Sequence, residues 1–340
     1  MKNNVPVQLT FEDYGHTLHH TQISSMEGDW LVYDTRNDDT KINETSSIEL
    51  LNTTTLEIKR IYQTENQSLY GPGVGAATFS PKENKVIFIH GIRNCSEANP
   101  YSATRRTGVA ISLDFPNQPI FMDARNIQSP FTAGALRGGT HSHSWHENGK
   151  WISFTYNDYV LEQQAKIGAN VLDQRVVGMM FPKKVEVPLD KELENNCGEM
   201  FSVIVSKVVL NAQNGSDEIE KAFDECWVKN SYNIAFQGNV RGENGELKTE
   251  IFIANIPNEI IFTTEDDLKG SFTSIPTVPQ CISQKRITFT EKGISSFRHW
   301  LRSSPTGNEI YFLMEDELQI TQIFGVELEF NQITQYTFLE

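Results

Sequence analysis

The sequence contains few cysteines, and their spacing excludes two classes of protein. Its 340 residues include four, Cys95, Cys197, Cys226 and Cys281, and no two of them form a CxxC pair. A zinc knuckle needs closely spaced Cys and His pairs, and a small disulfide-stabilised domain needs a denser set of cysteines. We therefore expect four reduced, structural thiols in a cytoplasmic protein.

Positive charge is also scarce. Lysine and arginine number 29 against 44 aspartates and glutamates, which gives a net charge of −15. Nucleic acids and anionic membranes both require a positive face, so we expect neither as a partner. No apolar run approaches the ~20 residues of a membrane span. Residues 1–8 lack the apolar core of a secretory signal.

Two catalytic motifs are missing as well. The sequence has no GxSxG, the nucleophile elbow of many serine hydrolases. The glycine-rich residues 71–75 suggest a phosphate-binding loop, but no GKS or GKT follows them. Close backbone packing at the start of a strand explains these glycines better.

What the chain does contain is a repeat. In five places a short turn sequence rich in Ser, Pro, Asn and Gly precedes an alternating apolar run, which predicts strand, tight turn, strand. The first residues of the five turns, here called the anchors, are Ser25, Ser80, His146, Val228 and Ser304. An internal repeat of such hairpins predicts an all-β fold, a β-propeller.

We expect residues 1–340 to form one propeller domain. Its blades are expected at roughly 12–62, 70–125, 137–212, 222–262 and 286–338, with residues 6–11 as an outer strand that closes the ring. Five blades are visible, and the position of the closing strand predicts a larger ring of about seven.

Two helical segments and one long excursion interrupt the strands. A short helix is expected near 160–168, and a helical lead-in at 216–223 precedes blade four. The excursion, about 160–198, reads as a loop around Pro182 and Pro188. The outer strands of blade three are expected to follow it, at 200–210.

Aligning the repeats groups several histidines. His20, His141 and His299 lie five residues before their anchors, and Gln22 and His143 lie three before theirs. Side chains two residues apart on a strand share a face. The first strand of each blade lines the central channel of a propeller. The four histidines are therefore expected to gather at one end of the channel.

Such a cluster predicts a metal site. Imidazoles with one carboxamide suit Mn, Fe, Ni or Zn better than Ca or Mg. The predicted ligands are His20, Gln22, His141, His143 and His299. The alternative is a hydrogen-bonded polar plug that fills the channel mouth. The remaining histidines fall outside the inward frame and are interpreted as surface or packing residues: His16, His19, His90 and His146.

Arginines and turn residues are expected at the same end of the channel. Arginines near the channel of an acidic protein would select an anionic ligand, a carboxylate or a phosphate. Salt bridges to nearby carboxylates, and the backbone preferences of Asn and Asp in turns, are the alternatives. The predicted substrate-binding residues are Arg36, Arg93, Arg137, Asn157, Asp158 and Arg298.

The hairpin repeat resembles that of the TolB-type propellers. More closely, segments 71–77, 135–143, 234–239 and 298–305 look like a bacterial family of uncharacterised TolB-like propellers. This likeness covers nearly the whole chain. It implies the propeller fold, and the family carries no established activity.

A more distant likeness is to the oligogalacturonate lyases, carried by Thr140-His-Ser-His-Ser-Trp145 and the His20/Gln22 pair. Those enzymes are seven-bladed propellers that hold a divalent metal on histidines and a glutamine, with a further histidine as base. The resemblance implies that His141 or His299 is a catalytic base. It would abstract the proton α to a uronate carboxylate, and β-elimination would follow.

Two functions follow from these observations. The first is a channel site for an anionic small molecule or oligosaccharide, with metal-dependent uronate lyase chemistry. The second is a non-catalytic propeller that uses the same face to bind a ligand or a protein partner.

Overall fold

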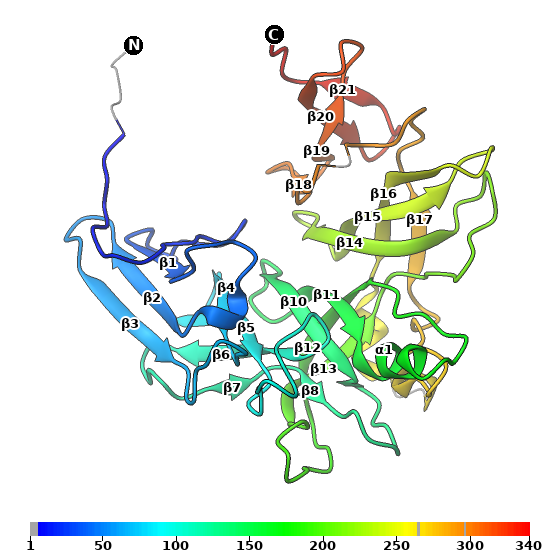
Figure 1. The fold of residues 1–340 in the computed structure, drawn as a ribbon. Helices are drawn as coiled ribbons and strands as arrows, with labels where there is room; N and C mark the ends of the chain where they lie inside the picture. The colour runs from blue at the N-terminus through cyan, green and yellow to red at the C-terminus, as the bar shows by residue number, and fades with distance from the viewer. Residues whose placement is uncertain (1–5, 264–265, 296) are drawn as a thin grey trace.

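Antiparallel sheets follow one another along the chain in the computed structural model, which describes residues 6–263, 266–295 and 297–340. Each of these sheets uses consecutive strands in chain order. The sheets are arranged around an arc, and the first and last of them stand at its two ends (Figure 1). This is the β-propeller architecture that the repeat predicted.

The strands have the following bounds. The first sheet contains β1 (Trp30–Asp34), β2 (Ser47–Asn52) and β3 (Ile58–Gln63). The second contains β4 (Val74–Phe79), β5 (Lys85–Gly91), β6 (Arg106–Ser112) and β7 (Ile120–Phe121). A parallel pair, β8 (Ala124–Arg125) and β9 (Ala135–Leu136), leads to the third sheet.

The third sheet contains β10 (Gly138–Trp145), β11 (Ile152–Asp158), β12 (Val176–Val185) and β13 (Gly198–Ile204). The fourth contains β14 (Ile219–Trp227), β15 (Asn233–Arg241), β16 (Leu247–Asn255) and β17 (Ser283–Arg286). The last contains β18 (Arg302–Ser303), β19 (Glu309–Glu315), β20 (Thr321–Glu327) and β21 (Ile333–Gln335). The helical segments are α1 (Tyr159–Lys166) and the 3-10 turns η1 (Ile42–Glu44), η2 (Asn258–Phe262) and η3 (Asp266–Lys269).

The five anchors share one hydrogen bond. In each hairpin the backbone N–H of the anchor donates to the carbonyl five residues later, at 2.8–2.9 Å. The pairs are Ser25 with Trp30, Ser80 with Lys85, His146 with Trp151, Val228 with Asn233 and Ser304 with Glu309. The repeat read from the sequence is therefore a repeat of the same turn geometry.

The four larger hydrophobic core clusters each lie between two consecutive sheets. On β5, Val86 and Phe88 belong to the cluster shared with the first sheet, whereas Ile87 belongs to the cluster shared with the third. Alternate residues of a strand face opposite sides of the sheet. The continuous apolar run of β5 is thus explained by a neighbouring sheet on both of its faces.

The inner strands β4, β10 and β14 carry a bulge at the same repeat position. The strand register shifts between Gly75 and Thr78 in β4, and it shifts at the matching place in the other two. Four residues before their anchors, Ala76, Ser142 and Asp224 have φ angles of +57°, +60° and +51°. Non-glycine residues rarely adopt this conformation, and bulges of this kind redirect side chains next to functional sites.

The predicted short helix is confirmed, and the helical lead-in is wrong. Asp158 caps α1 by accepting a hydrogen bond from the backbone N–H of Leu161 at 2.9 Å. Residues 219–227 form strand β14 instead of a helix. Ile219 and Ala222 are fully buried against the third sheet, and pairing with β15 outweighs the local helix signal of Ser216 and its acidic neighbours.

The excursion of the third sheet also differs from the prediction. It contains strand β12, which begins at Val176, and the outermost strand is β13 rather than 200–210 as a whole. The strand was not predicted because proline, here Pro182, is rare inside a β-sheet. Beyond Met180, β12 pairs with β13 alone, so the missing N–H of Pro182 interrupts no second ladder.

The segment 6–11, predicted as an outer strand, forms no strand in the structure. Val7 and Phe11 are exposed, at 77% and 72% of their surface. The alternating pattern of this segment suits a strand, but a strand exists only where another edge pairs with it.

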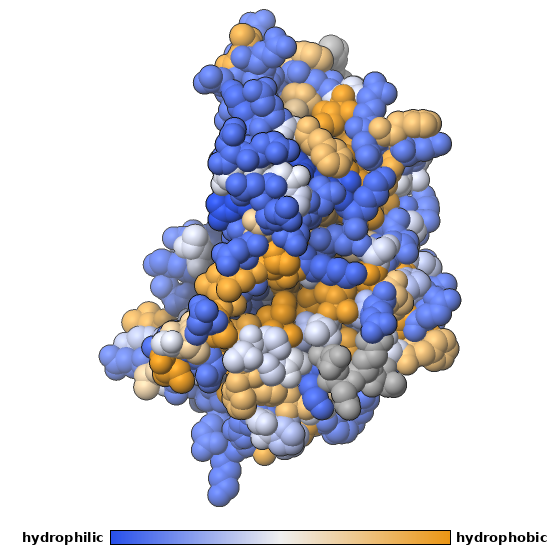
Figure 2. All heavy atoms as spheres, turned by 90° about the vertical axis from the view of Figure 1, so that its right-hand side faces the viewer, coloured by the Kyte–Doolittle hydropathy of each residue, from blue (hydrophilic) through white to orange (hydrophobic). Residues whose placement is uncertain are grey.

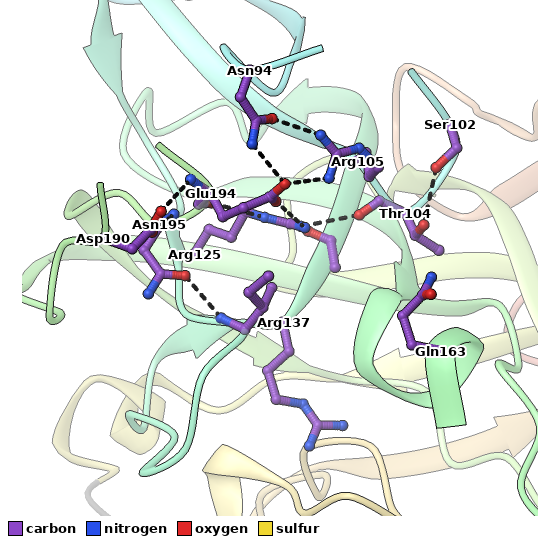
Figure 3. Close-up of polar contacts among 12 residues, drawn as sticks. Asn94, Ser102, Thr104, Arg105, Arg125, Arg137, Gln163, Asp190, Glu194 and Asn195 are labelled. Carbon is purple, nitrogen blue, oxygen red and sulfur yellow. Dashed lines mark hydrogen bonds and ion pairs between the residues drawn. The ribbon is translucent and has the colours of Figure 1, made fainter. Parts of the chain in front are cut away.

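A buried ionic network joins the excursion to the second sheet (Figure 3). Arg125 is fully buried and donates to the carbonyls of Thr104 (3.0 Å), Gly138 (2.5 Å) and Glu194 (3.1 Å). The Glu194 carboxylate accepts from Arg105, from Asn94 at 2.9 Å and from Arg125 at 3.5 Å. We call Arg105, Arg125 and Glu194 the buried network.

The face shown in Figure 2 is largely hydrophilic, with a band of hydrophobic atoms across its middle. The exposed hydrophobic side chains of the molecule include Ile261, Phe262 and Phe272, in the connection between β16 and β17. Within the described residues, no helix is long and apolar enough to span a membrane. Cys95, Cys197 and Cys226 form no disulfide bond within the described residues.

Candidate functional site

The inner strands and the turns beside them enclose a pocket of about 470 Å³, here called the channel pocket. Two of the three bulge residues, Ala76 and Ser142, lie in its wall. The pocket is lined from the segments 18–20, 36–42, 101–106 and 298–300, and by Ala76, Ile89, His141, Ser142 and Arg175. Residues from both ends of the chain thus meet those of the second and third sheets.

Four arginines line the channel pocket, and one of them is neutralised. Arg36 forms a buried ion pair with Asp34, with Nε 2.6 Å from Oδ1, and lies 3.4 Å from Asp39. Asp34 also accepts from the backbone N–H of Ala76 at 2.8 Å. Arg36 therefore holds the bulge of β4 in place, and its charge is already balanced.

The other three arginines form no ion pair among the residues that the structure describes. Arg106 donates from Nε to the carbonyl of Ala103 at 3.2 Å and lies 5.4 Å from the ring centre of Tyr101. Arg175 donates from Nε to Oδ1 of Asn157 at 3.1 Å. The guanidinium of Arg298 lies 4.7 Å from the ring centre of Trp300.

Their charges act on one another. Burial, and then the charge of Arg106, lower the pKa of Arg175. Asp224 and Asp173 are the acids whose charges act on Arg175. Burial raises the pKa of Asp224, although Arg298 and Arg175 attract its charge. The pocket therefore concentrates positive charge inside a strongly acidic chain, an arrangement that favours an anion.

His141 lies among these arginines in the neutral state. It is 6% exposed, and burial followed by the charges of Arg106 and Arg175 holds its pKa well below the usual value. Its Nδ1 is buried without a hydrogen-bond partner among the described residues. A neutral imidazole with an unused nitrogen can accept or donate one proton to a ligand.

His20 is held by contacts from the far end of the chain. Arg302 donates to the His20 carbonyl at 2.7 Å and to His20 Nδ1 at 3.2 Å, and the imidazole stacks on Trp300 at 4.5 Å. Arginine can only donate, so Nδ1 accepts and the ring hydrogen is on Nε2. That Nε2, like Nε1 of Trp300, is buried and has no partner in the described structure.

The predicted metal ligands do not come together as one set. Gln22 uses its amide on the backbone of Trp145, accepting from N–H at 2.8 Å and donating to the carbonyl at 2.6 Å. His143 bonds through Nε2 to Thr140 Oγ1 at 3.0 Å. In the described part of the chain, no group of three or more His, Cys, Asp or Glu is placed to hold a metal.

His299, predicted as a ligand or a base, has both ring nitrogens occupied. Nδ1 is 2.7 Å from the carbonyl of Phe297, and Nε2 accepts from the backbone N–H of Leu313 on β19 at 3.1 Å. The inner strand was predicted to begin at His299, but β18 begins three residues later, at Arg302. The His299 ring supplies the acceptor that a paired strand would otherwise provide to Leu313. Its contacts are structural, and it does not line the channel pocket.

The predicted substrate-binding residues divide into two groups. Arg36 and Arg298 line the channel pocket, and Asn157 orients Arg175. Arg137 is fully buried and paired with Asp158 at 2.6 Å, and Asp158 also caps α1. Arg93 donates to the carbonyl of Asn195 at 3.2 Å, away from the channel pocket.

Three basic residues of the channel pocket were not among the predicted site residues. His19 was interpreted as a surface or packing residue, yet it lines the pocket beside His20. Arg106 opposes Gly91 across the β5–β6 pair, and Arg175 precedes Val176, which opposes Tyr156. Gly91 and Asn157 both follow their anchors by eleven residues. The two arginines thus occupy equivalent repeat positions. The sequence alignment did not show this equivalence, because it placed no strand at β12.

Comparison with known proteins identifies one protein family and one fold. A family model described as "Protein of unknown function (DUF3748)" matches residues 73–195. The uncharacterised protein YidR of Escherichia coli (strain K12) is 34% identical over 339 residues, which cover 97% of this chain and 78% of YidR. The expected likeness to an uncharacterised family is confirmed.

Two solved structures are similar to this chain. An oligogalacturonate lyase from Vibrio parahaemolyticus has a TM-score of 0.51 at 11% identity, over 97% of this chain and 67% of that one. A putative TolB from Agrobacterium tumefaciens has a TM-score of 0.46 at 11% identity, over 92% of this chain and 78% of that one. The first of these two structures supports the β-propeller fold of this chain, and an identity this low establishes nothing beyond the fold.

Proposed function

The chain belongs to the protein family of Escherichia coli YidR, and we propose that it binds an anionic small molecule or acidic oligosaccharide in the channel pocket. One observation carries the proposal. Arg106, Arg175 and Arg298 line one pocket of a chain whose net charge is −15, and none of them is paired with a carboxylate in the described structure.

The physical argument rests on desolvation. Arg106 and Arg175 are partly buried, and Arg298 is exposed. A partly desolvated guanidinium without a partner is costly, and an anionic ligand would offset that cost at Arg106 and Arg175 with charge-assisted hydrogen bonds. A volume of about 470 Å³ is within the range of small-molecule sites. The unpartnered groups in the wall, such as His20 Nε2 and Trp300 Nε1, add donors and no negative charge.

Calorimetric titration with galacturonate oligomers tests this proposal. Replacing Arg106 or Arg175 by Gln removes a charged donor and should weaken binding by about 1.5–3 kcal/mol. The matched control is Arg60→Gln, since Arg60 lies on β3, outside the channel pocket, and is paired with Glu49 at 3.1 Å. Equal affinity in all four proteins, or no binding of any anionic saccharide by the native chain, would refute it.

A second function, uronate lyase chemistry, is favoured by His141. Its neutral imidazole, amid arginines that would bind the carboxylate, suits removal of the proton on the carbon next to that carboxylate. The C–H electron pair would form the new double bond, and the glycosidic oxygen would leave with its bond pair and take a proton from water. No described residues form a metal ligand group, so the proposal contains no metal step.

The alternative is a non-catalytic propeller that binds an anionic ligand or a protein partner. Unsaturated uronate absorbs in the ultraviolet, so product formation from oligogalacturonate separates the two functions. A lyase predicts product in the native protein and none in His141→Ala, which should still bind the substrate. Binding without product would leave the anion-binding function and refute the lyase.

A further inference from the structure

The unpaired donors of the channel pocket come from two groups of residues, and we propose that its ligand carries two anionic groups, one for each group of residues. This inference rests on the proposed anion-binding function and specifies the ligand class. We call Arg106 and Arg175 the inner end, because they come from the second and third sheets. We call His20, Arg298 and Trp300 the outer end, because they come from the two terminal parts of the chain.

At the inner end, the two guanidinium groups form the same kind of hydrogen bond with the protein. Nε of Arg106 donates to the Ala103 carbonyl, and Nε of Arg175 donates to Asn157 Oδ1. Neither Nη nitrogen of either residue has a partner in the described structure. The protein fixes each side chain by its stem and leaves the planar fork free, and that fork matches the two oxygens of a carboxylate or a phosphate.

At the outer end, two aromatic rings leave their N–H groups unused. His20 and Trp300 stack at 4.5 Å with an interplanar angle of 6°, and the guanidinium of Arg298 lies 4.7 Å from the Trp300 ring. His20 Nε2 and Trp300 Nε1 are both buried without partners among the described residues. Both can only donate here, so the missing partner is an acceptor, and a neighbouring guanidinium favours an anionic one.

Hydrogen bonds from Arg302 fix the arrangement of the outer end. Arg302 ties it together by donating to the carbonyl and to Nδ1 of His20, and this bond sets the tautomer that places a hydrogen on Nε2. Residues 282 positions apart in the sequence are thereby fixed in one wall of the pocket.

His141 lies within the electrostatic reach of both ends. The charges that lower its pKa after burial include Arg106 and Arg175 of the inner end and Arg298 of the outer end. A ligand that satisfies both ends therefore passes His141. A ligand with a single anionic group satisfies one end and leaves the donors of the other without acceptors.

Calorimetry with a matched series tests the proposal. The probes are galacturonate, with one carboxylate, digalacturonate, with two, and the dimethyl ester of digalacturonate, with none. Fructose 6-phosphate and fructose 1,6-bisphosphate repeat the comparison with phosphate groups. A probe with two acidic groups is called a dianion here and a probe with one a monoanion, although each phosphate group itself carries close to two charges at pH 7. In at least one of the two series, the dianion should bind at least about tenfold more tightly than the monoanion. The series that shows this difference identifies the kind of anion.

Two variants assign the ends. Arg175→Gln removes an inner donor, and Trp300→Phe removes the outer N–H but keeps a ring for His20 to stack on. Each should lower the dianion affinity toward that of the monoanion, while monoanion affinity changes by no more than about threefold because one end remains intact. Thermal unfolding shows whether both variants fold as the native protein does.

Binding of the two ligand series distinguishes a site for two anionic groups from a site for one. If monoanions and dianions bind equally well, the pocket is an anion site with one end, and only the present proposal falls. If Trp300→Phe affects both probes equally, the outer end holds no second anion, and the proposal falls again. If no charged probe of either series binds the native protein, anion binding itself is refuted.

Discussion

The chain places two groups of arginines in opposite surroundings. In the buried network, Arg105 and Arg125 share the Glu194 carboxylate, and Arg125 satisfies its remaining donors on backbone carbonyls (Figure 3). In the channel pocket, Arg106 and Arg175 use only Nε, and no carboxylate pairs with them within the described residues. Arg105 and Arg125 are buried, whereas Arg106 and Arg175 are only partly buried. The two groups also differ in the use of their Nη nitrogens, which the structural arginines spend on protein acceptors and the pocket arginines leave unpaired.

The largest effect is expected in the buried network. Glu194→Ala leaves the fully buried Arg125 and its neighbour Arg105 without a counter-charge, and should lower the free energy of unfolding by about 3–5 kcal/mol. Urea unfolding followed by circular dichroism measures it. Glu192→Ala, an exposed carboxylate in the same loop, is the matched control and should change little. A loss no larger than that of the control would contradict the structural role of the Glu194 ion pairs.

Acid is expected to lower the stability of the folded protein through the buried residue His143. Burial, followed by the charge of Arg106, lowers the pKa of His143 from 6.5 to about 3. The unfolded chain therefore binds the proton first, and the stability that neutral His143 contributes is lost as pH falls from 6.5 toward 3. The loss reaches up to about 1.4 kcal/mol per pH unit.

His143→Gln cannot bind this proton in either state. Its free energy of unfolding should consequently fall less steeply with acid than that of the native protein between pH 6.5 and 4. Urea titrations at several pH values give the two slopes. Parallel slopes would mean that His143 is protonated in the folded protein over this range.

A smaller change in stability is expected at the channel pocket. Arg106→Gln removes a charge with no ionic partner, so the free energy of unfolding should stay within about 1 kcal/mol of the native value, and its sign can be favourable. Thermal unfolding without ligand measures it. A loss comparable to that of Glu194→Ala would show that Arg106 is a structural arginine after all.

The smallest effect is expected for a cation that is paired but exposed. Lys166 lies 3.3 Å from Glu162 on α1, and its side chain is 59% exposed. Lys166→Ala should cost about 0.3–0.5 kcal/mol, because solvent screens such a helical pair. Ligand affinity should not change. A larger loss of stability would mean that pairing matters more than burial.

Much of the fold could be predicted because its signals are local. The turn sequence at Ser80 and at Ser304 specifies the same backbone bond, and the apolar run of β5 records a sheet on each side. The helix 216–223 failed because capping residues give a weak local preference that strand pairing overrides. Strand β12 was missed because Pro182 was read without knowing that the strand is paired on only one side there.

The site was only partly predictable. Alignment found His20 and His141 because their repeat positions point inward, and Arg298 was predicted as an arginine beside His299 in an acidic chain. It could not show that the His299 ring would accept a hydrogen bond from the backbone of Leu313, or that Gln22 would bond to the backbone of Trp145. These side chains have several partners within reach, and the choice depends on which backbone groups other segments leave unpaired.

The sequence by itself therefore determined the periodic part of this protein: hairpins of one geometry, arranged as the sheets of a propeller, in a strongly acidic chain without a nucleophile elbow. Only the tertiary structure decided which arginines are neutralised and which are free. A carboxylate such as Glu194 or Asp34 reaches its arginine through the packing of sheets and loops, and electrostatic pairing depends on distance in space rather than in sequence. The same packing brought Arg302 to His20 and so made one wall of the channel pocket.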